Sequence, residues 1–186
     1  RDVTGVQTCA LPISNQTAAS TTVAYPIAIG LADANNNGIS ITAGSQITFA
    51  YSGVYTLAFS IQFINSNTSS SSNNNISIWL RKNDTGATGD LVDSNSDFQV
   101  PLSHGGTTGK LIAVTPFTFK VSAGDYIQIM WCTGDTNISI ATIAEQVSGP
   151  HIPRTPGVIV AVTQVASYPT YTAPVIETSK IGRAHV

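Results

Sequence analysis

The side chains that could carry out chemistry are few and scattered along the sequence. His104 lies in a glycine-rich stretch and His151 lies between Pro150 and Ile152, with no spacing typical of metal ligands. The sequence contains no Gly-rich phosphate loop, no nucleophile elbow and no pair of framework glutamates. We therefore predict a non-enzymatic protein that needs no cofactor, with both histidines as solvated or packing residues. A polysaccharide-degrading enzyme is an alternative that two facing carboxylates would support.

Three aspartates form the one cluster of acids that could bind a metal. Asp90, Asp93 and Asp97 stand in a segment rich in Asp, Gly, Asn and Ser, and loop carboxylates are the ligands that Ca²⁺ prefers. They lack the regular D-x-D-x-D-G spacing of a calcium loop. We interpret them as solvated loop acids and predict no metal site.

The stretch at residues 46–64 indicates the kind of framework that must position these residues. From Tyr55 to Phe63 every second residue is apolar, and small or polar residues stand between them. Such alternation is typical of a strand with one buried face. A strand of this length needs a second layer over its apolar face, and a turn at Ser52 and Gly53 joins it to a shorter strand at 47–49.

The rest of the chain repeats this pattern between turn signals, such as Asn37-Gly38, and shows no helical periodicity. Residues 158–165 are apolar on both faces, which predicts a strand that is covered on both sides. Residues 65–75 and 83–97 are polar loops. We predict an all-β fold of about eight to ten strands, an antiparallel β-sandwich of jelly-roll or immunoglobulin-like topology. The expected strands are 23–31, 39–42, 47–49, 55–63, 76–82, 98–102, 110–120, 126–132, 137–144 and 158–165.

The two ends of the chain match each other in an unusual way. When reverse-translated, TCALPI at 8–13 and IGRAHV at 181–186 correspond to the two strands of one DNA oligonucleotide, and VTGVQTCALPI resembles a translated sequencing adapter. We expect residues 1–13 and about 181–186 to be non-biological, as a fusion scar would be. The predicted domain is 14–165, followed by an irregular tail at 166–180.

Composition excludes several classes of protein. Charged residues make up 10% of the chain and its net charge is −2, so it lacks the basic stripe of a nucleic-acid-binding protein. No apolar run approaches the ~20 residues that span a bilayer. Outside the ends the one cysteine is Cys132, so no intrachain disulfide is expected, and its neighbours Met130 and Trp131 indicate a packed thiol in a strand.

Several motifs resemble known jelly-roll proteins. ITF at 47–49, GVY at 53–55 and GDYI at 124–127 are similar to the heads of complement-type globular domains and tumour necrosis factor relatives. A group of tailed-phage structural proteins is similar over residues 16–165. The motifs shared with that group are, in order, GVY at 53–55, WLRKN at 79–83, GDY at 124–126 with MW at 130–131, and the closing run from Pro153 to Val165.

This resemblance implies a jelly roll that forms a homotrimer. We expect a virion structural protein, a fibre or decoration knob on the particle surface that contacts other virion proteins and a host glycan or receptor, and no membrane insertion. The alternative is a secreted ligand or carbohydrate-binding module with the same fold. Candidate interface aromatics are Trp79, Tyr126 and Trp131. Candidate recognition residues, on loops expected together at one end, are Asn67, Asn73, Asn74, Asp90 and Asp93.

Overall fold

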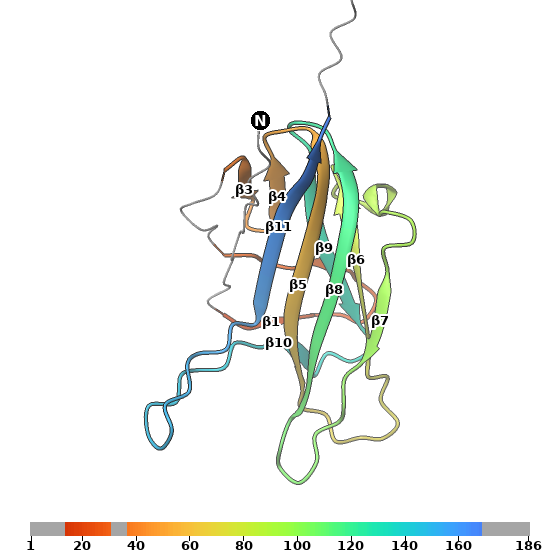
Figure 1. Cartoon of the computed structure of the whole chain (residues 1–186). Helices are drawn as coiled ribbons and strands as arrows, with labels where there is room; N and C mark the ends of the chain where they lie inside the picture. Colours follow the sequence, from red (N-terminus) through yellow and green to blue (C-terminus); the bar gives the residue numbers. More distant parts are fainter. Residues whose placement is uncertain (1–13, 31–36, 169–186) are drawn as a thin grey trace, which may run out of the picture.

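The computed structural model describes residues 14–30 and 37–168, which form two antiparallel sheets packed face to face (Figure 1). Sheet A contains β1 (Gln16–Thr17), β10 (Ile138–Ile140), β5 (Gly53–Asn65), β11 (Val158–Ser167) and β8 (Gly109–Val121). Sheet B contains β3 (Ile39–Thr42), β4 (Gln46–Phe49), β9 (Tyr126–Thr133), β6 (Asn75–Lys82), β7 (Ser96–Gln99) and β2 (Tyr25–Pro26). A 3₁₀ turn, η1 (Ala87–Gly89), follows β6.

These strands confirm the predicted all-β sandwich of jelly-roll topology. The described residues contain eleven strands, one more than the ten expected from the sequence, because the two-residue β1 also pairs, with β10 of sheet A. The predicted adapter-derived ends, nearly all of the tail and the first part of the Asn-rich turn before Gly38 lie outside the described residues.

Strand β5 is the centre of the fold. It pairs over its full 13 residues with β8 on one edge, and with β11 and then β10 on the other edge. The residues of its alternating apolar face are all 2% exposed or less, as the sequence pattern predicted: Tyr55, Leu57, Phe59, Ile61 and Phe63. This face packs on sheet B, since Phe49 of β4 lies 4.7 Å from the Tyr55 ring and Trp131 of β9 lies 5.7 Å from the Phe63 ring.

Two predictions about the arrangement are wrong. Strand β11 is not covered on both faces: Val158, Val160 and Val162 enter the core, but Ile159 and Ala161 point outward and are half-buried. The loops 65–75 and 83–97 do not lie together at one end, because they leave opposite ends of β6 (Figure 1). An eight-residue strand separates its ends by about 25 Å.

Removal of a single side chain from the β5 face tests how far the fold depends on it. We expect Leu57→Ala to lower the free energy of unfolding by about 3 kcal/mol, because Leu57 is fully buried and the deletion leaves a cavity. The matched Ser40→Ala change, at an exposed position of β3, is expected to stay within about 0.5 kcal/mol. Chemical denaturation measures both, and a loss below about 1 kcal/mol for Leu57→Ala would contradict the central role of β5.

Candidate functional site

An open cleft of about 370 Å³ lies on the outer face of sheet B. Its volume is within the range of small-ligand sites, which begins at about 300 Å³. Its lining comes from β6, β9 and the segment that follows η1: Ser77, Trp79, Asp90, Leu91, Asp93, Asn95 and Cys132.

The alternation of β6 places the aromatic wall of the cleft. Ile76, Ile78 and Leu80 enter the core with at most 1% exposure, so the residues between them must point away from it. Trp79 is one of these outward residues and is half-buried. Ser77, two positions earlier, pairs in register with Cys132 of β9, which brings these two small side chains together beside the indole.

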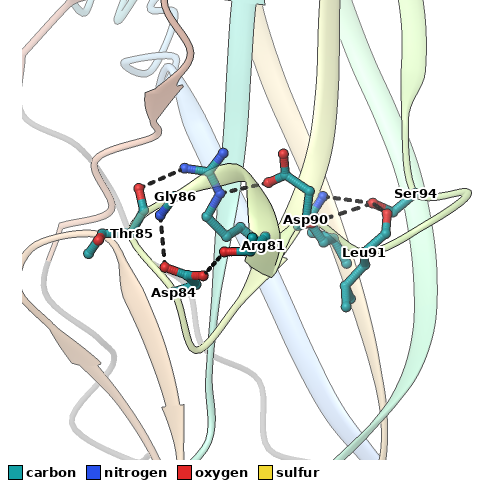
Figure 2. Close-up of polar contacts among 9 residues, drawn as sticks. Arg81, Asp84, Thr85, Gly86, Asp90, Leu91 and Ser94 are labelled. Atoms are coloured by element: carbon teal, nitrogen blue, oxygen red, sulfur yellow. Dashed lines mark hydrogen bonds and ion pairs between the residues drawn. The ribbon is translucent and has the colours of Figure 1, made fainter.

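The chain after η1 runs back along the edge of β6 (Figure 2) and supplies the other lining residues of the cleft. The Leu91 N–H donates to the Leu80 carbonyl at 2.9 Å, which continues the sheet pairing beyond the end of β7. The buried Ser94 hydroxyl donates to the Leu91 carbonyl at 2.7 Å and accepts from the Leu80 N–H at 3.0 Å. Residues 90–95, which the sequence predicts as a polar loop, are therefore hydrogen-bonded to the edge of sheet B.

An ion pair fixes the near end of this segment. The Arg81 Nε donates to Asp90 Oδ1 at 2.6 Å and Nη1 donates to the Thr85 carbonyl at 3.1 Å (Figure 2). Arg81 is only 7% exposed, so its charge depends on this partner. The hydrogen bond from Arg81 is the main reason that the pKa of Asp90 lies below its usual value.

The Asp90 carboxylate helps to orient the indole of Trp79. Its Nε1–H is buried and has no acceptor at full hydrogen-bonding geometry, yet it is near enough to Asp90 to help lower the pKa of that carboxyl. A buried N–H without an ideal acceptor is costly, by about 1–3 kcal/mol, so the indole is expected to stay next to this carboxylate. The nitrogen edge of the ring therefore faces the protein, and the rest of the ring lines the cleft.

Asp97, outside the cleft lining, accepts one hydrogen bond from each of two cleft residues. The Ser77 hydroxyl donates to Asp97 Oδ1 at 2.5 Å, and the Asn95 amide nitrogen donates to the same oxygen at 3.1 Å. These two bonds hold the pKa of Asp97 below its usual value. Much of the cleft lining is apolar, from Trp79, Leu91 and Cys132. Its polar part consists of the Asp90 and exposed Asp93 carboxylates together with the Ser77 hydroxyl and the Asn95 amide.

The three aromatic residues predicted for a subunit interface lie in different environments. Trp131 cannot serve there, because it is 1% exposed and packs in the core against Phe63 and Tyr25. Trp79 lines the cleft, and Tyr126 is half-buried at the start of β9. The prediction of a packed Cys132 thiol is also incorrect: since Trp131 points inward, its neighbour points outward and is half-buried.

The asparagines predicted for recognition lie at the other end of β6 and largely hold their own loop. Asn74 is 8% exposed and its Oδ1 accepts from Asn65 and Ser72, so the prediction of an exposed recognition residue is wrong for Asn74. Asn67 is half-buried and donates to Asp135 Oδ2 at 2.5 Å. Asn73 remains exposed.

Asp135 anchors that loop, a role that no motif in the sequence indicates. Burial opposes its ionisation, but the hydrogen bonds from the Asn137 backbone and from Asn67 outweigh burial and lower its pKa. The carboxylate is 7% exposed, so it stabilises the loop from inside and does not contact solvent ligands.

The residues considered for chemistry do not converge. His104 is exposed in a turn, and His151 is exposed on a different loop, 2.5 Å from Glu145. Within residues 14–30 and 37–168 no three His, Cys, Asp or Glu side chains are arranged to hold a metal ion. No helix in this part of the chain is long and apolar enough to cross a bilayer.

Comparison with known proteins identifies the fold. No protein-family model matches the chain, and no curated protein matches its sequence. The structure is similar to that of the Eiger TNF from S. frugiperda, with a TM-score of 0.58 and 13% sequence identity over 92% of this chain and 98% of that one. The fold is therefore a tumour necrosis factor-like jelly roll.

Sequence reasoning found part of the cleft. The sequence indicates Trp79, Asp90 and Asp93 as candidate functional residues, but for an interface, a metal or a recognition loop, whereas it predicts Cys132 only as a packed thiol and indicates no role for Ser77, Leu91 and Asn95. The available signal was the outward face of 76–82, on which Ser77, Trp79 and Arg81 alternate with the core residues. Nothing local indicated that residues 90–95 would run back along the edge of β6.

The ion pair beneath the cleft gives a test through pH. We expect Asp90→Asn to lower the free energy of unfolding by about 1 kcal/mol at pH 7, since the carboxylate is partly exposed and Arg81 is left without its partner. The folded pKa of Asp90 is depressed below the unfolded value of about 3.9, so this contribution is present above that pH. The difference from wild type should shrink as the pH falls through the folded pKa.

Asp93→Asn is the matched control, because the exposed Asp93 carboxylate is not among the ion pairs of the described residues. Urea unfolding at a series of pH values measures all three proteins. An Asp90→Asn deficit that persisted unchanged at the lowest pH would refute the assigned electrostatic origin.

Proposed function

We propose that this chain is a non-enzymatic jelly-roll head that assembles with copies of itself through the outer face of sheet A and leaves sheet B free for contact with other molecules. The observation that carries the proposal is an exposed apolar face on β5, β8 and β11. This face has the composition of an interface, although it belongs to the surface of a single chain.

Exposure shows that this face is uncovered. Ile112 and Val114 of β8 are 58% and 62% exposed, and Ile159 of β11 is half-buried. The register brings them together, since Ser60 of β5 pairs with Val114 on one side and Ile159 on the other. The small Ser60 between two large aliphatic side chains leaves a broad surface that a flat partner can contact.

The charge pattern of this face favours burial. Its outward residues are uncharged over the middle of all three strands: Thr56, Ala58, Ser60, Gln62, Ile112, Val114, Pro116, Thr118, Ile159, Ala161 and Thr163. Charges occur at the two ends of β8, at Lys110 and Lys120. Interfaces are depleted in charge at their centre and polar at their rim, which is the pattern seen here.

The arm between β10 and β11 supports the same conclusion. Ala141 and Gly157 each bond to the backbone of Gln62, so the arm leaves and rejoins the edge of β5 at one residue. Every residue from 144 to 154 is exposed, including Val147 at 79% and Ile152 at 49%, and the arm projects away from the sandwich (Figure 1). An isolated two-stranded hairpin is marginal in water, so contact with a neighbouring copy would stabilise it.

The setting that we propose is a virion, in which three such heads form a fibre tip or decoration knob, because ordered motifs over residues 16–165 resemble tailed-phage structural proteins. The second candidate is a secreted ligand, favoured by the fold likeness to the Eiger TNF. Folds of this kind carry many functions, so the genes beside this one decide between them. Capsid, portal or tail genes would support the virion role, whereas a secretion signal in the complete gene would overturn it.

Light scattering on the purified chain tests the assembly. We expect a mass of about three times 19.4 kDa at micromolar concentration. The Val114→Lys change should give a folded monomer, because it places a charge at the centre of the contact. Val92→Lys is the control, since Val92 is 88% exposed on the loop beside sheet B. A monomeric wild-type protein would sink the proposal.

A further inference from the structure

We infer that the cleft on sheet B binds the ring of a neutral sugar, with Trp79 as the stacking surface and Asp90, Asp93 and Asn95 as acceptors for its hydroxyl groups. This inference names the chemical class of molecule that sheet B of the proposed jelly-roll head would contact. It rests on the proposed function only for the biological role of that contact. The cleft itself is formed within one chain, on the sheet opposite to the proposed assembly face.

The first argument is the aromatic wall. The half-buried Trp79 lines the open cleft, so part of its indole is accessible to a ligand, while its Nε1 atom is buried near Asp90. Large aromatic surfaces gain most when a ligand with an apolar face covers them. The C–H face of a hexose ring is such a surface, and its rim carries hydroxyls.

The second argument is the balance of donors and acceptors. The Ser77 hydroxyl gives its one proton to Asp97 and the Asn95 amide gives one of its two, so Ser77 can accept a hydrogen bond from a ligand and Asn95 can accept or donate one. The Asp93 carboxylate is exposed in the same cleft, and the second oxygen of Asp90 is not the one that binds Arg81. A ligand that donates several hydrogen bonds fits this lining, whereas phosphate, sulfate and other anions are repelled by it.

The third argument distinguishes a sugar from a cation. The charge of Asp90 is balanced by Arg81 at 2.6 Å, so a second cation would find one of the cleft's two lining carboxylates already compensated. No three metal-ligating side chains meet within the described ranges. A hydroxyl group can donate to these acceptors without requiring a free negative charge. The cleft therefore suits a sugar better than Ca²⁺ or an amine.

The cleft walls are also held in place before any ligand arrives. The Ser94 hydroxyl accepts from the Leu80 N–H of β6 and donates to the Leu91 carbonyl within its own segment (Figure 2). From β6, Arg81 donates to Asp90 of that segment and to the Thr85 carbonyl. A preorganised site loses less conformational entropy on binding, which matters for weak ligands such as single sugars.

The test is saturation-transfer NMR on the full chain with the methyl glycosides of glucose, galactose, mannose and N-acetylglucosamine. We expect at least one to bind with a dissociation constant on the order of 1 mM. Its binding should also change tryptophan fluorescence, because Trp79 lines the cleft while the other tryptophan, Trp131, is 1% exposed.

Variants locate the binding. Trp79→Ala should weaken it at least tenfold and Trp79→Phe less, because Phe keeps an aromatic face. Asp93→Asn, which keeps a side chain suited to the positive φ of 62° at this position, should weaken binding a few-fold. Tyr168→Ala, at a 42% exposed aromatic outside the cleft, is the control and should bind as wild type.

Two results would overturn the inference. One is that no glycoside binds, whether or not the cleft binds calcium chloride or tetramethylammonium; the other is that a glycoside binds with an affinity that neither the Trp79 nor the Asp93 substitution changes. The Val114→Lys variant separates this inference from the proposed assembly, since a monomer should keep the same affinity per site. Loss of assembly with retained sugar binding would leave the cleft assignment intact, and the reverse result would leave the assembly intact.

Discussion

The contact between the apolar face of β5 and the inner face of sheet B is the interaction on which the rest of the structure depends. β5 pairs with three other strands, so its position sets theirs. Its inward side chains meet Phe49 and Trp131 from sheet B in close ring contacts. Burial of this face is the main source of stability in a chain with 10% charged residues and few ion pairs among its described residues. All proposed contact surfaces are the outer sides of strands fixed in this way.

The two outer faces of the sandwich have different chemistry, although the same alternation produces both. On sheet A the outward residues over the middle of the strands are aliphatic or small and polar, and the charges of Lys110 and Lys120 lie at the two ends of β8. On sheet B the outward Trp79 and Arg81 attract a polar segment that folds back and makes a cleft. A face with an uncharged centre suits another copy of the chain, whereas a cleft with an aromatic side chain and a few polar groups suits a small ligand. The proposed assembly and the proposed ligand contact would therefore use opposite faces of one small domain.

The Arg81–Asp90 pair connects the framework to the cleft. Arg81 lies at the end of β6 with its charge almost buried, and Asp90 satisfies it from the returning segment. The same carboxylate faces the indole edge of Trp79 and therefore helps to orient the aromatic wall. Fold likeness to the Eiger TNF does not account for this arrangement, because at 13% identity it describes the path of the backbone and not the site.

The sequence by itself determined the fold class, the central strand and which residues of each strand share a face, because the period of two is local and strong over 55–63 and 76–82. It could not determine which of Met130, Trp131 and Cys132 faces the core, since all three are apolar and parity alone does not choose. It also could not place residues 90–95 against β6, because the Ser94 and Arg81 contacts that hold them join residues nine to fourteen positions apart. Tertiary structure decided these points, and so it decided where the cleft lies and that the two-sided apolar pattern of β11 is left half-covered. The physical reason is that the alternation along a strand determines which side chains share a face. Whether that face is buried depends on which distant segments pack against it.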